Sequence, residues 1–316
     1  MNTFINKYQS TAPGDAAPDN WVEKYAPRVT QPYLRLMRAD RPIGSWLLLI
    51  PCWQGLALAA TQQETAAIGH MIVMAVLFTI GAFVMRGAGC AYNDIVDQDF
   101  DARVERTAGR PIPSGQISTR QAWAFLFGLC LIGLSVLMQF NRFTIMLGVS
   151  SLALVAVYPF AKRVTWWPQA WLGLTFNWGA LMGYAAVTGE LGVASFCLYG
   201  AGIAWTLGYD TIYAHQDKED DALIGVKSSA RRLGRNSKPA IAAFYAITIA
   251  LFAAIGVMEK FPWTYFVALC APAAHFFWQV RTTDIDDSAR CLRIFKSNRD
   301  AGLLLLAALL LALVRW

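Results

Sequence analysis

The chain has 316 residues, of which 56% are hydrophobic and only 15% are charged, and its mean hydropathy is +0.38. This composition excludes an ordinary water-soluble protein and predicts an all-α protein that crosses a membrane several times. The formal net charge of +6 does not indicate nucleic-acid binding. In a membrane protein such an excess reflects topology and contact with anionic lipids.

The N-terminal segment differs from the rest of the chain. Residues 1–30 are polar with charges of both signs, and Pro13 and Pro18 interrupt any helix. We predict a flexible leader over residues 1–30 and a single transmembrane domain over residues 31–316. The leader has no secretory signal pattern, and its acidic residues are atypical of a mitochondrial transit peptide.

Nine apolar stretches follow the leader, each long enough or nearly long enough to span a bilayer. They lie near residues 43–61, 68–91, 121–139, 143–160, 170–188, 193–213, 239–257, 262–280 and 301–316. The segments that alternate on one side of these spans carry 24 of the 27 lysines and arginines. Positive residues stay on the inner side of a membrane, so we place the N-terminus on the cytoplasmic side, or on the matrix side of a mitochondrial membrane.

The second span leads directly into an acidic stretch, Asn93 to Asp101. On a helix Asp94, Asp97 and Asp101 share one face, whereas Asp99 points elsewhere. Carboxylates on one face repel one another and are costly inside a bilayer, so this face requires the aqueous boundary and nearby cations. Carboxylate oxygens with open coordination positions suit Mg²⁺ that also binds a phosphate.

A second acidic stretch ends the sixth span. Asp210, Asp217 and Asp221 again share a helical face. Four spans separate the two stretches, so both open on the same side of the membrane. We therefore predict that they are the two halves of one metal–diphosphate site.

The two stretches read NDxxDxxxD and DxxYAxxDxxxD, and further matching segments lie at residues 38–44, 158–163, 168–169, 176–179 and 225–228. With these motifs the chain resembles the UbiA family of intramembrane aromatic prenyltransferases, and in particular its 4-hydroxybenzoate polyprenyltransferase branch. The resemblance begins near Pro32. It implies helices arranged around a central cavity, and transfer of a polyprenyl group from polyprenyl diphosphate to the ring carbon ortho to the hydroxyl of 4-hydroxybenzoate, in ubiquinone biosynthesis.

The expected site contains one residue set for each ligand. The resemblance implies that Mg²⁺ is held by Asp94, Asp97, Asp101, Asp210, Asp217 and Asp221, which we also expect to be the catalytic residues. Arginine and lysine bind phosphate oxygens, which suggests diphosphate contacts for Arg103, Arg110 and Lys227. We expect further substrate contacts from Asn93, Tyr213, Lys162 and Arg38. The family places an arginine for the aromatic acid at Arg38, with Arg41, Lys162 and Arg163 as competitors.

Two other functions are compatible with parts of the pattern. One is a UbiA-type enzyme with another acceptor, such as a naphthoate, homogentisate, or a haem or chlorophyll precursor. The segments at 158–163 and 176–179 favour hydroxybenzoate. The other is an ion-coupled transporter, but its ionisable groups would be distributed through the span centres. We expect a multi-pass protein of the bacterial inner (cytoplasmic) membrane, with the mitochondrial inner membrane as the alternative location.

The charge asymmetry predicts which loops face the cytoplasm or matrix. A cysteine placed at Ser114, in a variant without the native cysteines, should react with a membrane-impermeant thiol reagent only from that side. A cysteine placed at Gln63 should react only from the opposite side. Labelling of right-side-out and inverted vesicles measures both, and the reverse pattern would overturn the predicted topology and the predicted side of the site.

Overall fold

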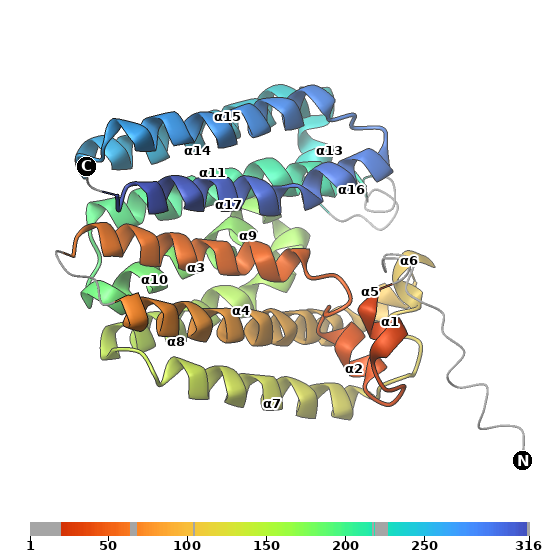
Figure 1. Cartoon of the computed structure of the whole chain (residues 1–316). Coiled ribbons are helices and arrows are strands. Elements are labelled where there is room, and N and C mark those ends of the chain that lie inside the picture. Colours follow the sequence, from red (N-terminus) through yellow and green to blue (C-terminus); the bar gives the residue numbers. More distant parts are fainter. Residues whose placement is uncertain (1–19, 64–67, 104, 217, 219–226, 315–316) are drawn as a thin grey trace, which may run out of the picture. The chain divides into compact units, whose positions relative to one another are not determined.

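The structure is a computed structural model that describes residues 20–63, 68–103, 105–216, 218 and 227–314. Within these residues every regular element is a helix, and there is no strand (Figure 1). The predicted all-α fold class is confirmed. Of the predicted leader, residues 1–19 lie outside the described part. Residues 20–30 include helix α1 (Trp21–Tyr25), whose Val22 is buried.

The chain divides into two compact units, and two long helices run from one unit into the other. Unit 1 is Met1–Ser45 with Ile80–Met138, and unit 2 is Trp46–Thr79 with Gln139–Trp316. The shared helices are α3 (Ile43–Thr61) and α4 (Ile68–Val96). Unit 1 also has α1, α2 (Gln31–Leu36), α5 (Gln98–Asp101), α6 (Glu105–Ala108) and α7 (Thr119–Leu137). Unit 2 has α8 (Arg142–Val164), α9 (Pro168–Phe176), α10 (Trp178–Thr188), α11 (Val193–Ala214), α13 (Ser229–Leu233), η2 (Gly234–Asn236), α14 (Ser237–Met258), α15 (Trp263–Thr282), α16 (Ser288–Lys296) and α17 (Asn298–Leu311).

Each predicted span falls on a helix, except that the stretch 170–188 forms two helices, α9 and α10, which meet at Asn177. Five helical segments of the described chain are long and apolar enough to cross a membrane: Ile43–Thr61, Ile68–Val96, Thr119–Leu137, Arg142–Ala161 and Ser229–Met258. The class of polytopic membrane protein is confirmed, while the number of nine crossings stays a prediction.

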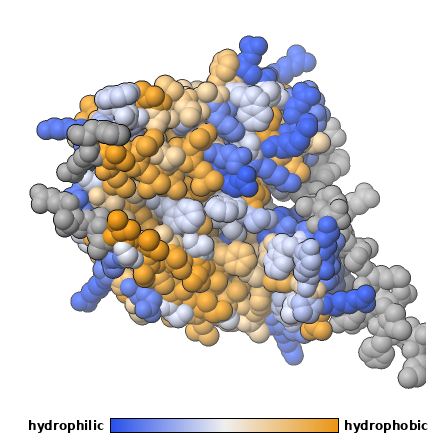
Figure 2. Space-filling view, in the orientation of Figure 1, coloured by the Kyte–Doolittle hydropathy of each residue, from blue (hydrophilic) through white to orange (hydrophobic). Residues whose placement is uncertain are grey.

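Large apolar side chains on the outside of several helices explain why the chain needs a bilayer. Ile68 on α4 is 75% exposed, Leu131 on α7 is 66% exposed and Met146 on α8 is 61% exposed. Figure 2 shows hydrophobic side chains over the middle of the helices and hydrophilic ones towards their ends. Exposed apolar surface on this scale is unfavourable in water and favourable in lipid.

Helix α11 forms the centre of unit 2, where it packs against α9, α10, α14 and α16. Its neighbours approach closely because glycines face them. A Cβ at Gly202 would collide with the Asn177 side chain, and one at Gly208 would collide with the Tyr245 ring. The C-terminal end of α11 carries Asp210 and Tyr213, so a largely buried helix positions the start of the second acidic motif.

Helices α3 and α10 also approach each other through small residues. A Cβ added to Gly183 would collide with the carbonyl oxygen of Cys52, and one added to Gly55 would collide with that of Ala180. Small residues four apart are typical of close packing between membrane helices, and Gly179 and Gly183 have this spacing.

Gly183→Ala should therefore destabilise the protein. Overpacking against backbone atoms costs about 1–3 kcal/mol, and the midpoint of thermal unfolding in detergent measures the loss. The matched control is Gly128→Ala in α7, where an added Cβ meets no atom within 4 Å. Equal unfolding midpoints for the two variants would contradict the proposed contact.

Candidate active site

The first acidic motif lies where α4 ends and α5 begins. Helix α4 ends at Val96, and Asp97 leaves helical geometry with φ −98° and ψ 6°. The backbone hydrogen bonds continue through the bend, from the Asp97 amide to the Asn93 carbonyl and from the Asp101 amide to the Asp97 carbonyl, both 2.9 Å. The motif is therefore two helices joined at Asp97, a bend that the spacing of the aspartates alone does not reveal.

The bend still leaves the three predicted carboxylates on the buried side. Asp94 and Asp97 are each 1% exposed and Asp101 is 8% exposed, whereas Asp99 is exposed. Asn93 is half-buried. Carboxylates this deeply buried require compensating charge.

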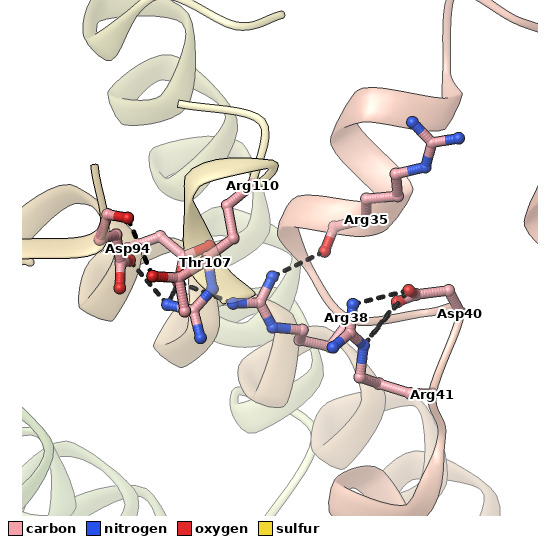
Figure 3. A network of polar contacts seen from close by, with 8 residues as sticks. Arg35, Arg38, Asp40, Arg41, Asp94, Thr107 and Arg110 are labelled. Carbon is pink, nitrogen blue, oxygen red and sulfur yellow. Dashed lines mark hydrogen bonds and ion pairs between the residues drawn. The ribbon is translucent and has the colours of Figure 1, made fainter. Parts of the chain in front are cut away.

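Two arginines supply that charge in unit 1 (Figure 3). The Arg38 guanidinium donates to Asp94 Oδ1 at 2.8 Å and to the Arg35 carbonyl at 3.1 Å. The Arg110 guanidinium donates to the same oxygen of Asp94 at 3.2 Å and to Asp101 Oδ2 at 2.6 Å. Arg110 thus bridges two of the predicted metal ligands.

The other oxygen of Asp94 has a different environment. Asp94 Oδ2 is buried and has no hydrogen-bond partner among the residues that the structure describes. An unpartnered buried polar atom costs about 1–3 kcal/mol. A carboxylate oxygen is also the donor type that Mg²⁺ prefers, so this atom fits a metal ligand.

The pKa of Asp101 reflects the same crowding of charge. Burial raises the pKa of its carboxyl above the usual value, the Arg110 guanidinium opposes that rise, and the negative charges of Asp94 and Asp97 add to it. Additional positive charge beside these carboxylates would therefore stabilise their ionised forms.

Arg38 reaches Asp94 from a strained backbone. Its φ is 61°, in the left-handed region that residues other than glycine rarely adopt. Its competitor Arg41 is engaged by the buried Asp40, to which its guanidinium donates at 2.9 and 3.2 Å on one carboxylate oxygen and at 3.3 Å on the other. Of these two arginines, Arg38 contacts the first acidic motif and Arg41 pairs with its own neighbour.

The second motif is described only in part. Asp210 and Tyr213 lie in the last turn of α11, both half-buried, and the Tyr213 ring packs against the Phe295 ring with 4.6 Å between centroids. Asp217 and Asp221 lie outside the described residues. Among those described, no three acidic, histidine or cysteine side chains stand close enough together to hold a metal ion. The predicted set of six ligands therefore stays a prediction.

The remaining predicted basic residues are on the surface or engaged elsewhere. Arg103 is exposed. The Lys227 ammonium donates to the Val164 carbonyl at 3.1 Å and lies 5.9 Å from the centre of the Trp166 ring. The side chain of Lys162 lies outside the described part. Substrate contact by these residues stays a prediction.

Two polar side chains outside the motifs, the half-buried Arg86 and the buried Asn177, lie on membrane helices or at their junction. The guanidinium of Arg86, on α4, lies against Gly44, where an added Cβ would come within 2.6 Å of its Nε. It shares a face of α4 with Asn93, which lies seven residues further along that helix. In unit 2 the Asn177 amide donates to the Thr206 hydroxyl at 2.8 Å, which gives this buried side chain the partner that it requires.

A model of the UbiA prenyltransferase family matches residues 48–314. The chain belongs to the UbiA prenyltransferase family. It is similar to proteins named "4-hydroxybenzoate polyprenyltransferase, mitochondrial" in Caenorhabditis elegans and Homo sapiens. The first is 48% identical over 285 residues, which are 90% of this chain and 79% of the relative. The second is 48% identical over 288 residues, which are 90% of this chain and 76% of the relative.

Solved structures share the fold of this UbiA family member. The apo structure of a UbiA homologue from Aeropyrum pernix K1 matches with a TM-score of 0.71 at 24% identity, covering 85% of this chain and 98% of that one. A UbiA homologue from Archaeoglobus fulgidus bound to GPP and Mg²⁺ matches with a TM-score of 0.68 at 19% identity. The match covers 89% of this chain and 99% of that one. At these identities the likeness shows the fold alone.

Proposed function

We propose that this UbiA family member transfers a polyprenyl group from polyprenyl diphosphate to 4-hydroxybenzoate, at the ring carbon ortho to the hydroxyl, and releases diphosphate. This is a step of ubiquinone biosynthesis. The observation that carries the proposal is the 48% identity, over 90% of the chain, to relatives named for this activity. A UbiA homologue bound to GPP and Mg²⁺ supports the prenyl diphosphate and metal parts of it.

The diphosphate half of the site is proposed to combine both acidic motifs. Asp94, Asp97 and Asp101 would hold Mg²⁺ on one side, and Asp210, Asp217 and Asp221 on the other. The unpartnered Oδ2 of Asp94 supports this assignment, because it is a buried carboxylate oxygen that no described donor satisfies. Bound Mg²⁺ would neutralise the diphosphate and make it a better leaving group.

Arginines and a lysine would complete the diphosphate contacts. Arg110 already joins Asp94 to Asp101, so a phosphate that binds between these acids would meet its guanidinium. Arg103, Lys227 and the Asn93 amide are proposed as further contacts. All of them follow or adjoin one of the acidic motifs in sequence.

The acceptor carboxylate is proposed to bind Arg38. A benzoate that enters a low-dielectric cavity needs a compensating charge, and a guanidinium supplies charge and orientation together. The contact between Arg38 and Asp94 would place the acceptor beside the diphosphate site. Lys162 and the exposed Arg163 remain candidates, and the half-buried Arg86, whose guanidinium packs against Gly44, is a further one.

Transfer then requires a carbocation protected from water. Loss of diphosphate leaves an allylic cation, the ring carbon ortho to the phenol hydroxyl attacks it, and the displaced ring proton leaves. The aromatic ring of Tyr213, which lies one turn from Asp210, would stabilise positive charge on the allyl group. The apolar helices around the site would exclude the water that would otherwise quench the cation.

The relatives named above are mitochondrial proteins. Their names support the mitochondrial inner membrane as the location of the reaction, and the matrix side is proposed from the charge asymmetry of the sequence. The bacterial inner membrane, with the site facing the cytoplasm, stays a prediction from the sequence. In either membrane the hydrophobic polyprenyl chain of the donor must reach the site from the bilayer.

The first test is metal-dependent turnover. Membranes that contain the protein should prenylate labelled 4-hydroxybenzoate with Mg²⁺ and should lose that activity in EDTA. Asp94→Ala should lower the rate by about 100-fold or more, because loss of one charge-stabilising group at a transition state has that scale. Product formation is measured by chromatography at several prenyl chain lengths.

The matched control is Asp99→Ala, since Asp99 belongs to the same motif but is exposed. It should retain activity, and both variants should keep the wild-type elution volume in detergent. Full turnover in EDTA would contradict the metal proposal. Prenylation of a naphthoate or homogentisate in place of 4-hydroxybenzoate would favour the alternative acceptors.

The second test concerns Arg38. Arg38→Ala should raise KM for 4-hydroxybenzoate about ten- to a hundred-fold, as expected for loss of a charge-assisted hydrogen bond, and leave KM for the prenyl diphosphate nearly unchanged. Arg38→Lys should recover only part of the affinity. Arg120→Ala, at an exposed arginine on the same predicted side, is the control.

The contact between Arg38 and Asp94 makes one other result informative. If KM for the prenyl diphosphate rises and that for the acceptor does not, Arg38 serves the diphosphate site through Asp94. The acceptor role would then pass to Lys162, Arg163 or Arg86, and KM for both substrates in an alanine variant of each residue would identify which.

A further inference from the structure

A basic cavity in unit 2 is lined, among the residues that the structure describes, by side chains that belong to neither acidic motif. Its volume is about 790 Å³, and its walls come from the start of α14, the end of α15, the segment that follows and α16. Four cationic side chains line it: Lys238, Arg281, Arg290 and Arg293. Asp284 is the acidic residue in the lining, so cations outnumber acids there by four to one.

Within the described part of the chain, the cations of the cavity have few acidic partners. Arg290 has weak ion pairs with Asp284, at 3.9 Å, and with Asp287, at 3.4 Å. For Lys238, Arg281 and Arg293 no carboxylate partner is found in the part of the chain that the structure describes. Side chains of like charge repel one another, so this arrangement favours an anionic ligand.

The cavity lies where helices of the membrane domain end. Lys238 is in the first turn of α14 and Arg281 in the last turn of α15, and these two helices pack together. Trp278 also lines the cavity and is 45% exposed, as is typical of aromatic residues at the membrane–water boundary. Figure 1 shows α16 at this end of the α14–α15 pair.

Helix α16 has the character of a helix at that boundary. Cys291, Ile294 and Phe295 are buried beneath it, whereas Arg290, Arg293 and Lys296 are exposed. A short helix with one apolar face and one basic face suits the headgroup region of a bilayer.

We propose that this cavity binds the headgroup of an anionic phospholipid. The cations would contact the phosphate, and Trp278 and the apolar wall of α15 would contact the glycerol and upper acyl chain. Basic pockets between membrane helices on the inner side have the chemistry that recognises such headgroups. A free phosphate would use the same cations but would gain nothing from Trp278 or from the adjoining Phe277, which is 67% exposed.

The proposal is tested by lipid binding without turnover, so its result is independent of the proposed enzymatic function. Native mass spectrometry of the purified full chain in detergent would count bound lipids during titration with phosphatidylglycerol or with phosphatidylcholine. The wild type should retain phosphatidylglycerol more tightly. The double variant Arg281→Gln/Arg293→Gln should bind it about 30-fold more weakly, as expected for two lost cations near a headgroup.

The control removes the same charge from exposed positions outside the cavity, through Arg232→Gln/Arg235→Gln. It should bind like the wild type, with thermal unfolding midpoints that show all proteins to be folded. An equal loss of phosphatidylglycerol affinity in the control would overturn the proposal, because the overall surface charge and not this cavity would then bind the lipid. Equal affinity for phosphatidylcholine, or complete displacement of the lipid by inorganic diphosphate, would also overturn it.

Discussion

The buried carboxylate of Asp94 is the constraint on which the arrangement of unit 1 depends. Asp94 lies near the end of a membrane helix and is 1% exposed, so its charge must be balanced by the protein or by a ligand. Arg38 reaches it from 56 residues before and Arg110 from 16 residues after. These two ion pairs tie the segment after α2 and the loop after α6 to the end of α4, where a diphosphate and its metal are proposed to bind.

In unit 2, hydrogen bonds position helix α11, which leads into the second acidic motif. A polar group inside a bilayer protein needs a protein partner, because lipid offers none. Along α11 the Trp205 ring nitrogen donates to Asn298 at 2.9 Å, and the hydroxyls of Thr211 and Ser229 lie 2.7 Å apart. These contacts fix the position of α11 along its axis, and therefore the depth of Asp210 in the membrane domain.

Sequence reasoning succeeded where one physical signal dominates. Apolar runs predicted the long helices. In the first motif the spacing of the carboxylates predicted that Asp94, Asp97 and Asp101 share a face from which Asp99 points away, and these three are the buried ones. It missed the bend at Asp97, the break at Asn177 and helix α16, because hydropathy over a long window does not resolve a single turn. It also missed the pairing of Arg38 with Asp94, which depends on the left-handed backbone at Arg38 that no periodic pattern reveals.

The central claim is that the two acidic motifs hold the same ligand. A double-mutant cycle tests it by measuring the affinity of an unreactive prenyl thiolodiphosphate, with Mg²⁺, for the wild type, Asp94→Asn, Asp210→Asn and the double variant. One shared site predicts that the double variant loses less binding free energy than the sum of the single losses, by about 0.5–3 kcal/mol. Losses that add within about 0.5 kcal/mol would contradict the claim, because independent sites behave in that way.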